Sequence, residues 1–202
     1  LIMDFIENDK IKPSGFDNNF LETILNIHSF SNNKFGFKFD TQIGGMKQPN
    51  EYNSNWANFF SNQRLLIMYE AISRINPMPN EINIKIEKLI KKISEFIPEN
   101  PKPSLVHGDL WEGNMLFKNK KLVGLIDPGI FYGHNEMELA YLRWFKIVDK
   151  KFIQKYDNYS KLNKNYYEYE PIYQLYYSLS NIHLWSRNYI NDTAKLLKKI
   201  KI

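Results

Sequence analysis

The chain has 202 residues, 43% of them hydrophobic, with a formal net charge of +5 and no cysteine. This length and composition predict a globular protein with a core of ordinary size and exclude disulfides and thiolate metal sites. The lysines are spread over helix-like segments and partly offset by acids, so they do not indicate nucleic-acid binding. No apolar run reaches the roughly 18 residues of a membrane helix, and no signal-peptide pattern is found. We expect a cytoplasmic protein without a membrane or nucleic-acid partner.

The first quarter of the sequence predicts a strand, a helix and a long loop. Residues 1–7 form an apolar, strand-like run. Apolar residues then recur at helical spacing over 17–30, with Asp17 as a plausible N-cap. Residues 31–54 are rich in Asn, Gly, Gln and Pro and show no sustained period, so we expect an irregular loop.

The remaining residues predict a mostly helical chain that is interrupted by short strands. Helices are expected over 55–75, 81–97, 136–148 and 166–190, the second with a regular apolar stripe opposite its lysines. Strands are expected over 104–110, 114–117 and 122–127, the last two as a hairpin. The C-terminal run of lysines and leucines, 195–202, is expected to fray. The predicted fold class is therefore α+β, mostly helical, with a small sheet at its chemical centre.

A concentrated group of polar side chains lies within residues 104–129. Asp109 and Asn114 belong to one turn between predicted strands, and Asp127 ends the next strand, so the hairpin can bring them together. Phosphoryl transfer from ATP needs such a set: a carboxylate to accept the proton of the attacking hydroxyl, and an amide and a second carboxylate to hold Mg²⁺. This order of residues is the catalytic-loop and metal-loop pattern of protein-kinase-like enzymes.

Neither His-Gly-Asp nor Asp-Pro-Gly alone is strong evidence of a function, because Asp-Pro-Gly is an ordinary turn sequence and Asp beside Gly is common in loops. The combination at this separation, with apolar strands between, favours a function. His107 is expected to support the loop rather than to react, and Gly108 allows a tight turn. The other histidines do not indicate a metal site, since they lack partners at ligand spacing.

At these motifs the sequence resembles the fructosamine (ketosamine) kinases, relatives of aminoglycoside and choline kinases in the aminoglycoside phosphotransferase superfamily. The similar segments are "HGDLWEGN" (107–114), "LIDPGIFYGHNEMELA" (125–140), the insert around 35–65, and "YQLYYSLSNIHLW" (173–185). The resemblance covers nearly the whole chain, and Trp111 and the insert set it apart from aminoglycoside kinases.

The resemblance implies a protein-kinase-like C-terminal lobe that phosphorylates the O3 hydroxyl of a free or protein-linked ketosamine with ATP and Mg²⁺, which leads to deglycation. It implies that Asp109 is the catalytic base and that Asn114 and Asp127 bind the metal. Trp111 would be a platform for the sugar-amine substrate, because an aromatic face suits a cationic ligand. Three further carried-over residues are candidates for substrate contact or loop support: Tyr132, His134 and Glu136. Glu138 is expected to support the catalytic loop.

The sequence departs from the family in two places. Glu112 and Glu138 stand where smaller residues, Asp in the second case, are usual. More importantly, no Gly-rich phosphate loop and no strand Lys precede the catalytic loop, although these normally belong to an N-terminal lobe that covers ATP. The resemblance thus places 1–7 at the hinge between lobes and implies a chain without the ATP lobe. Two alternatives remain open: a kinase of an aminoglycoside, choline or similar hydroxylated amine, and a non-catalytic kinase-like fragment.

Overall fold

The computed structural model describes residues 4–13 and 18–202. Its helices are α1 (Asn18–Ser29), α2 (Trp56–Phe60), α3 (Leu66–Ile75), α4 (Asn80–Lys91), α5 (Asn135–Trp144), α6 (Lys150–Tyr159), α7 (Tyr166–Leu184) and α8 (Tyr189–Leu197). Its strands are β1 (Thr41–Ile43), β2 (Met46–Gln48), β3 (Pro103–Val106), β4 (Met115–Lys118), β5 (Lys121–Leu125) and β6 (Phe131–His134). None of the helices in these described ranges is long and apolar enough to cross a membrane.

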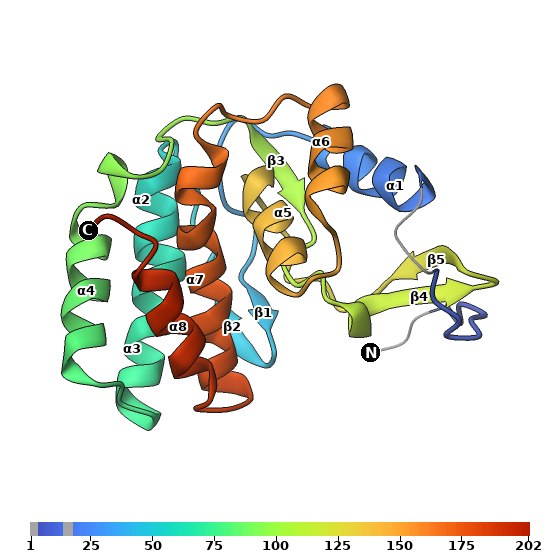
Figure 1. Cartoon of the computed structure of the whole chain (residues 1–202). Helices are drawn as coiled ribbons and strands as arrows, with labels where there is room; N and C mark the ends of the chain where they lie inside the picture. Colours follow the sequence, from blue (N-terminus) through green and yellow to red (C-terminus); the bar gives the residue numbers. More distant parts are fainter. Residues whose placement is uncertain (1–3, 14–17) are drawn as a thin grey trace.

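The helix α7 is the centre of the molecule. Its side chains are buried almost without interruption from Tyr169 to Ile182, and it packs against α3, α5 and α8. Figure 1 shows these helices and α4 side by side as one helical body, with β4 and β5 extending from the opposite side. A helix that is buried on all faces has apolar or aromatic residues around its whole circumference, which explains the Tyr-rich sequence of α7.

Two capping residues and one tight turn fix local structure. Asn55 and Asp149 each accept a backbone N–H three residues on, at 2.9 Å, and so begin α2 and α6. The β4–β5 hairpin closes through Asn119 and Lys120, whose φ angles of 50° and 64° are those of a type I′ turn.

Several segments differ from the sequence prediction. Residues 31–54 are not wholly irregular, because β1 and β2 form a small antiparallel hairpin within them. The helix predicted over 55–75 contains a π-helical turn, Ser61–Leu65, between α2 and α3. The strand β6 and the helix α6 have no counterpart in the prediction. The C-terminus does not fray, since Leu196 and Leu197 are buried in the core.

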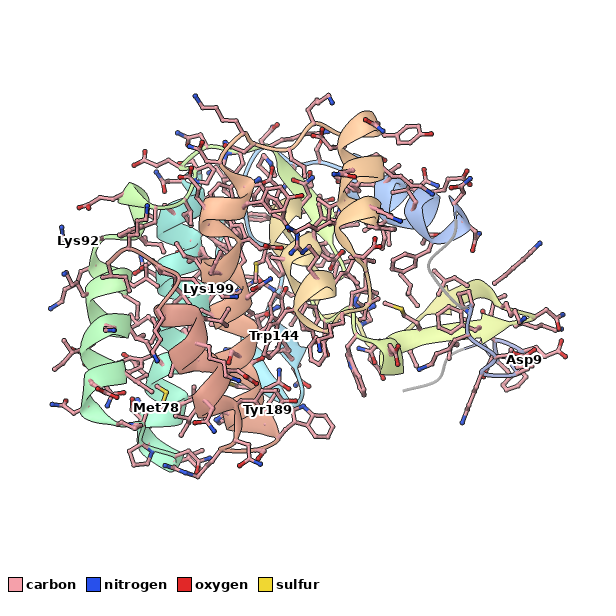
Figure 2. All side chains as sticks on the ribbon, viewed as in Figure 1. Asp9, Met78, Lys92, Trp144, Tyr189 and Lys199 are labelled. Carbon is pink, nitrogen blue, oxygen red and sulfur yellow. The ribbon has the colours of Figure 1, made fainter. Side chains whose placement is uncertain are left out.

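The predicted hinge strand (1–7) and the predicted first helix (17–30) lie partly outside the described residues. Residues 1–3 and Asp17 lie outside them, and the described residues 4–13 form no strand. This segment instead lies along the β4–β5 hairpin, where Asp9 N donates to Phe117 O at 2.9 Å and Lys118 pairs with Glu7 at 2.6 Å. Figure 2 shows Asp9 beside this hairpin.

The strands β3 and β6 position the loops that carry the polar group. They pair antiparallel, with Val106 at the end of β3 opposite Phe131 at the start of β6. The chain therefore leaves β3 and enters β6 at the same point. The segments that follow Val106 and precede Phe131 must lie side by side, and these contain the predicted catalytic and metal loops.

Candidate active site

Gly108 allows the catalytic and metal loops to touch. Its φ angle is +81°, in the left-handed region that disfavours other residues, and a Cβ atom there would lie 2.3 Å from the carbonyl oxygen of Gly129. The two loops are thus in backbone contact.

The structure brings Asp109, Asn114 and Asp127 together. The amide nitrogen of Asn114 donates to the backbone oxygen of Asp109 at 2.8 Å, and it lies 3.4 Å from the carboxylate of Asp109. The same nitrogen lies 3.5 Å from the backbone oxygen of Asp127. Asn114 is buried, Asp109 is half-buried and Asp127 is exposed. The amide of Asn114 is therefore the link between the two acidic residues.

The carboxylate of Asp109 is also held by Tyr141 of α5. The hydroxyl of Tyr141 donates to Oδ1 of Asp109 at 3.0 Å. Burial raises the pKa of Asp109, and the hydrogen bond from Tyr141 opposes this only in part. Burial and the neighbouring Asp109 charge raise the pKa of Tyr141 well above its usual value, so this hydroxyl remains a donor.

His107 and Glu138 support the predicted catalytic loop through hydrogen bonds to backbone groups. Nε2 of His107 hydrogen-bonds the backbone oxygen of Ile126 at 3.0 Å, on the strand side of the metal loop. Glu138 is buried and accepts the backbone N–H of Gly108 at 2.8 Å, while its other oxygen pairs with His28 at 2.9 Å. Burial would raise the pKa of Glu138, but the hydrogen bond and charge of His28, with the charge of His107 and the Gly108 N–H, together lower that pKa.

Tyr132, His134 and Glu136 lie elsewhere. They belong to β6 and the first turn of α5, and none of them lines the cavity that contains Asp109. His134 Nδ1 bonds the hydroxyl of Tyr173 at 2.8 Å, and Glu136 accepts the backbone N–H of Asn163 at 2.6 Å. The pKa of Glu136 is lowered, since His134 and its other hydrogen-bond donors outweigh its burial. This placement does not support substrate binding and favours the alternative of loop support.

A cavity of about 600 Å³ opens beside Asp109, Asn114 and Asp127, a size that suits a small-molecule ligand. It is lined by Asp109, Asn114 and Asp127, by Trp111, by residues 42–45 of the β1–β2 hairpin, and by residues from α5, the end of α7 and the start of α8. Tyr189, labelled in Figure 2, is one of these and packs on Trp144 with 5.8 Å between ring centroids.

The β1–β2 hairpin is fastened to the metal loop through Gln48. Its side-chain nitrogen donates to the backbone oxygen of Gly129 and to the hydroxyl of Thr41, both at 2.9 Å, and its oxygen accepts from Tyr176 of α7 at 3.0 Å. The hairpin therefore forms a fixed wall of the cavity.

Arg64, in the π-helical turn, anchors the other end of this insert. Its guanidinium is buried, donates to Pro49 O and Asn50 Oδ1 at 2.6 Å each, and lies over the ring of Phe131 at 4.0 Å. Burial lowers the pKa of Arg64 to about 10, so it stays protonated at neutral pH. The insert residues that carry the family resemblance thus hold the hairpin against β6.

Sequence reasoning did not find several cavity residues, namely Gln42–Gly45, Tyr141, Ser180, Asn181 and Trp185. Tyr141 lies three positions after Glu138 on an apolar helix face, where a tyrosine gives no separate signal. The others lie within the insert and the segment 173–185, which are distant in sequence from the catalytic and metal loops, and only tertiary packing brings them to the cavity.

The oxygen atoms of this site fit a hard cation such as Mg²⁺. No side-chain hydrogen bond among the described residues engages the carboxylate of Asp127, and Asn114 bonds through its nitrogen, which leaves its amide oxygen as a donor to metal. No group of three or more His, Cys, Asp or Glu suited to a metal exists in the described part of the chain. A site to which the protein gives only two ligands, here Asn114 and Asp127, is typical of Mg²⁺, because water and substrate phosphates complete the coordination of this ion.

A model of the fructosamine kinase family matches residues 1–202. The chain belongs to this family. A probable ketoamine kinase from Pasteurella multocida is 30% identical over 202 residues, covering 99% of this chain and 68% of that protein. One from Enterococcus faecium is 29% identical, covering 98% and 70%. As a member of the fructosamine kinase family, the protein is a phosphotransferase of the small-molecule kinase type.

Crystal structures of two candidate fructosamine-3-kinases have the same fold. The protein from Thermobifida fusca is 24% identical with a TM-score of 0.86, and the match covers 98% of this chain and 68% of that one. The protein from Haemophilus somnus is 28% identical with a TM-score of 0.82, and covers 97% and 67%. The predicted α+β, mostly helical class with a kinase-type architecture is confirmed.

Proposed function

We propose that the protein transfers the γ-phosphoryl group of ATP to the O3 hydroxyl of a ketosamine, such as a fructosamine, and that this leads to deglycation of the amine. The observation that supports the proposal is that Asp109, Asn114 and Asp127 lie together in one cavity, which Trp111 also lines. The names of the relatives support the substrate class. The lack of cysteine fits a cytoplasmic site of action.

In this proposal Asp109 orients the sugar hydroxyl and accepts its proton as the oxygen attacks phosphorus. Tyr141 and Asn114 hold the Asp109 carboxylate and its backbone in place for that contact. Asn114 and Asp127 would hold Mg²⁺, which neutralises phosphate charge when bound. Glu138 fixes the catalytic loop through the Gly108 amide, and Trp111 gives the substrate an apolar face.

The test is phosphoryl transfer to fructosyl-lysine, followed by ADP release and by phosphorus NMR of the product. We expect Asp109→Asn to lower the rate at least about a hundredfold, because general-base catalysis is lost while the residue keeps its size. Asp192→Asn, on α8 and outside the cavity, is the control and should leave the rate unchanged.

Three outcomes would count against parts of the proposal. A rate that survives Asp109→Asn would contradict its role as base. Faster transfer to an aminoglycoside or to choline than to fructosyl-lysine would contradict the substrate class. Calorimetric binding of fructosyl-lysine without any transfer would favour the non-catalytic alternative.

A further inference from the structure

Trp185 is a large apolar side chain at the mouth of the catalytic cavity. It caps the C-terminus of α7, lines the cavity, and is 70% exposed. Its ring meets that of Trp111 edge to face, with 6.2 Å between centroids and an interplanar angle of 68°. Two indoles therefore form an aromatic corner on one side of the cavity, although only Trp111 belongs to the catalytic-loop motif.

The ring of Trp111 and the backbone of Trp185 are held in place by their surroundings. A Cβ atom on Gly113 would lie 2.3 Å from the ring of Trp111, so that ring rests directly on the glycine backbone. Trp185 N donates to Asn181 O at 2.9 Å, and the preceding Leu184 packs closely on Gly44 at the tip of the β1–β2 hairpin. The Gly113 backbone thus positions the ring of Trp111, and the end of α7 and the β1–β2 hairpin position the backbone of Trp185, so that the two rings already meet in the absence of a ligand.

The charge of the cavity favours a cation. Its lining includes the carboxylates of Asp109 and Asp127, and no Lys, Arg or His is among the described residues that line it. The chain as a whole carries a net charge of +5, so this local excess of negative charge is opposite to the protein average. Indole faces attract cations through the ring quadrupole, and indole is the strongest of the aromatic side chains in this respect.

We propose that Trp185, together with Trp111, binds the protonated amine of the ketosamine and makes the enzyme prefer cationic substrates over neutral sugar derivatives. The inference rests on the proposed function and extends it, because it assigns recognition of the amine to a residue outside the catalytic and metal loops. Trp185 thus determines specificity, and Asp109 remains the group that orients the sugar hydroxyl and accepts its proton.

The experiment compares two ligands by isothermal titration calorimetry. One is an N-alkyl 1-amino-1-deoxyfructose, which is cationic at neutral pH, and the other is the ether analogue with oxygen in place of nitrogen. Trp185→Leu removes the aromatic face, Trp185→Phe keeps a smaller one, and Tyr159→Leu removes an exposed aromatic residue of α6 as a matched control. Mg-ATP is titrated in parallel against each variant.

The wild-type chain should bind the amine more tightly than the ether. Trp185→Leu should weaken amine binding about three- to tenfold and leave ether binding nearly unchanged, with Trp185→Phe between the two and Tyr159→Leu like the wild type. An unchanged amine preference in Trp185→Leu overturns the inference and leaves the proposed function intact. Loss of Mg-ATP affinity alone would assign Trp185 to the nucleotide and also overturn it. Failure of the wild type to bind either sugar would refute the proposed function itself.

Discussion

Gly108 occupies a position where any side chain would collide with the backbone of the metal loop. We predict that Gly108→Ala lowers the free energy of unfolding by at least about 2 kcal/mol, because it adds an overlap with Gly129 O to an unfavourable φ angle. Gly45→Ala is the matched control. Its φ of +83° is similar, but no atom lies within 4 Å of the added Cβ, so it should cost only about 1 kcal/mol. Urea unfolding measures both, and equal losses would contradict the steric argument.

Glu138 gives the protein a stability that depends on pH. Burial alone would raise its pKa in the folded protein above the usual 4.5, but His28, His107 and the Gly108 N–H together lower it. This contribution is fully present above pH 4.5 and is lost as the pH falls through the lower folded-state value. Glu138→Gln should therefore cost about 2 kcal/mol at neutral pH and lose less stability than the wild type between pH 5 and pH 3. Parallel pH profiles in thermal unfolding would contradict this role.

The residues of the catalytic constellation could be predicted because their spacing is itself a motif. Asp109, Asn114 and Asp127 meet as the hairpin pattern indicated, and Glu138 lies under the loop. The substrate contacts suggested for His134 and Glu136 are not supported, because these side chains bond within the fold instead. Trp185 could not be found, since its contact with Trp111 spans distant parts of the chain.

At the scale of elements, the hairpin β1–β2 depends on one glutamine. Gln48 joins β2 to the metal loop and to α7 by three hydrogen bonds. We predict that Gln48→Leu leaves Gly129 O and the Tyr176 hydroxyl unpaired and lowers stability by about 2 kcal/mol or more. Amide exchange should rise in residues 41–48. Tyr176→Phe removes only one of the bonds and should have a smaller effect, whereas equal protection in the two variants would contradict this account.

The helices show what periodicity can predict and what it cannot. The stripe over Asn80–Lys91 is regular because one face packs on the body and the other meets solvent, and the predicted helix is found there. The strand Phe131–His134 is too short to show an alternating pattern, and its backbone pairings with Pro103–Val106 and with Gly36 make it a strand. The π-helical turn at Arg64 leaves no periodic signal either, because it depends on burying the guanidinium against Asn50 and Phe131.

At the scale of the whole molecule, the C-terminal helix closes the core. Leu196 and Leu197 are 4% and 3% exposed, and α8 packs on both α7 and α4. We predict that Leu196→Ala lowers the free energy of unfolding by about 3 kcal/mol, since it leaves a cavity in this core. Lys195→Ala, a neighbouring exposed position, should change it by less than about 0.5 kcal/mol. A similar effect of the two substitutions would show that the end of α8 is not part of the core.

The contacts that hold the site have a consequence for the order in which the protein is made. Gln48 accepts a hydrogen bond from Tyr176, which is 128 positions later, and Trp56 donates to Tyr173, which is 117 positions later. A chain emerging from the ribosome has the whole catalytic motif long before it has α7. The β1–β2 hairpin therefore gains its full set of contacts only after α7 has been made, and such distant pairings favour slow closure of the site.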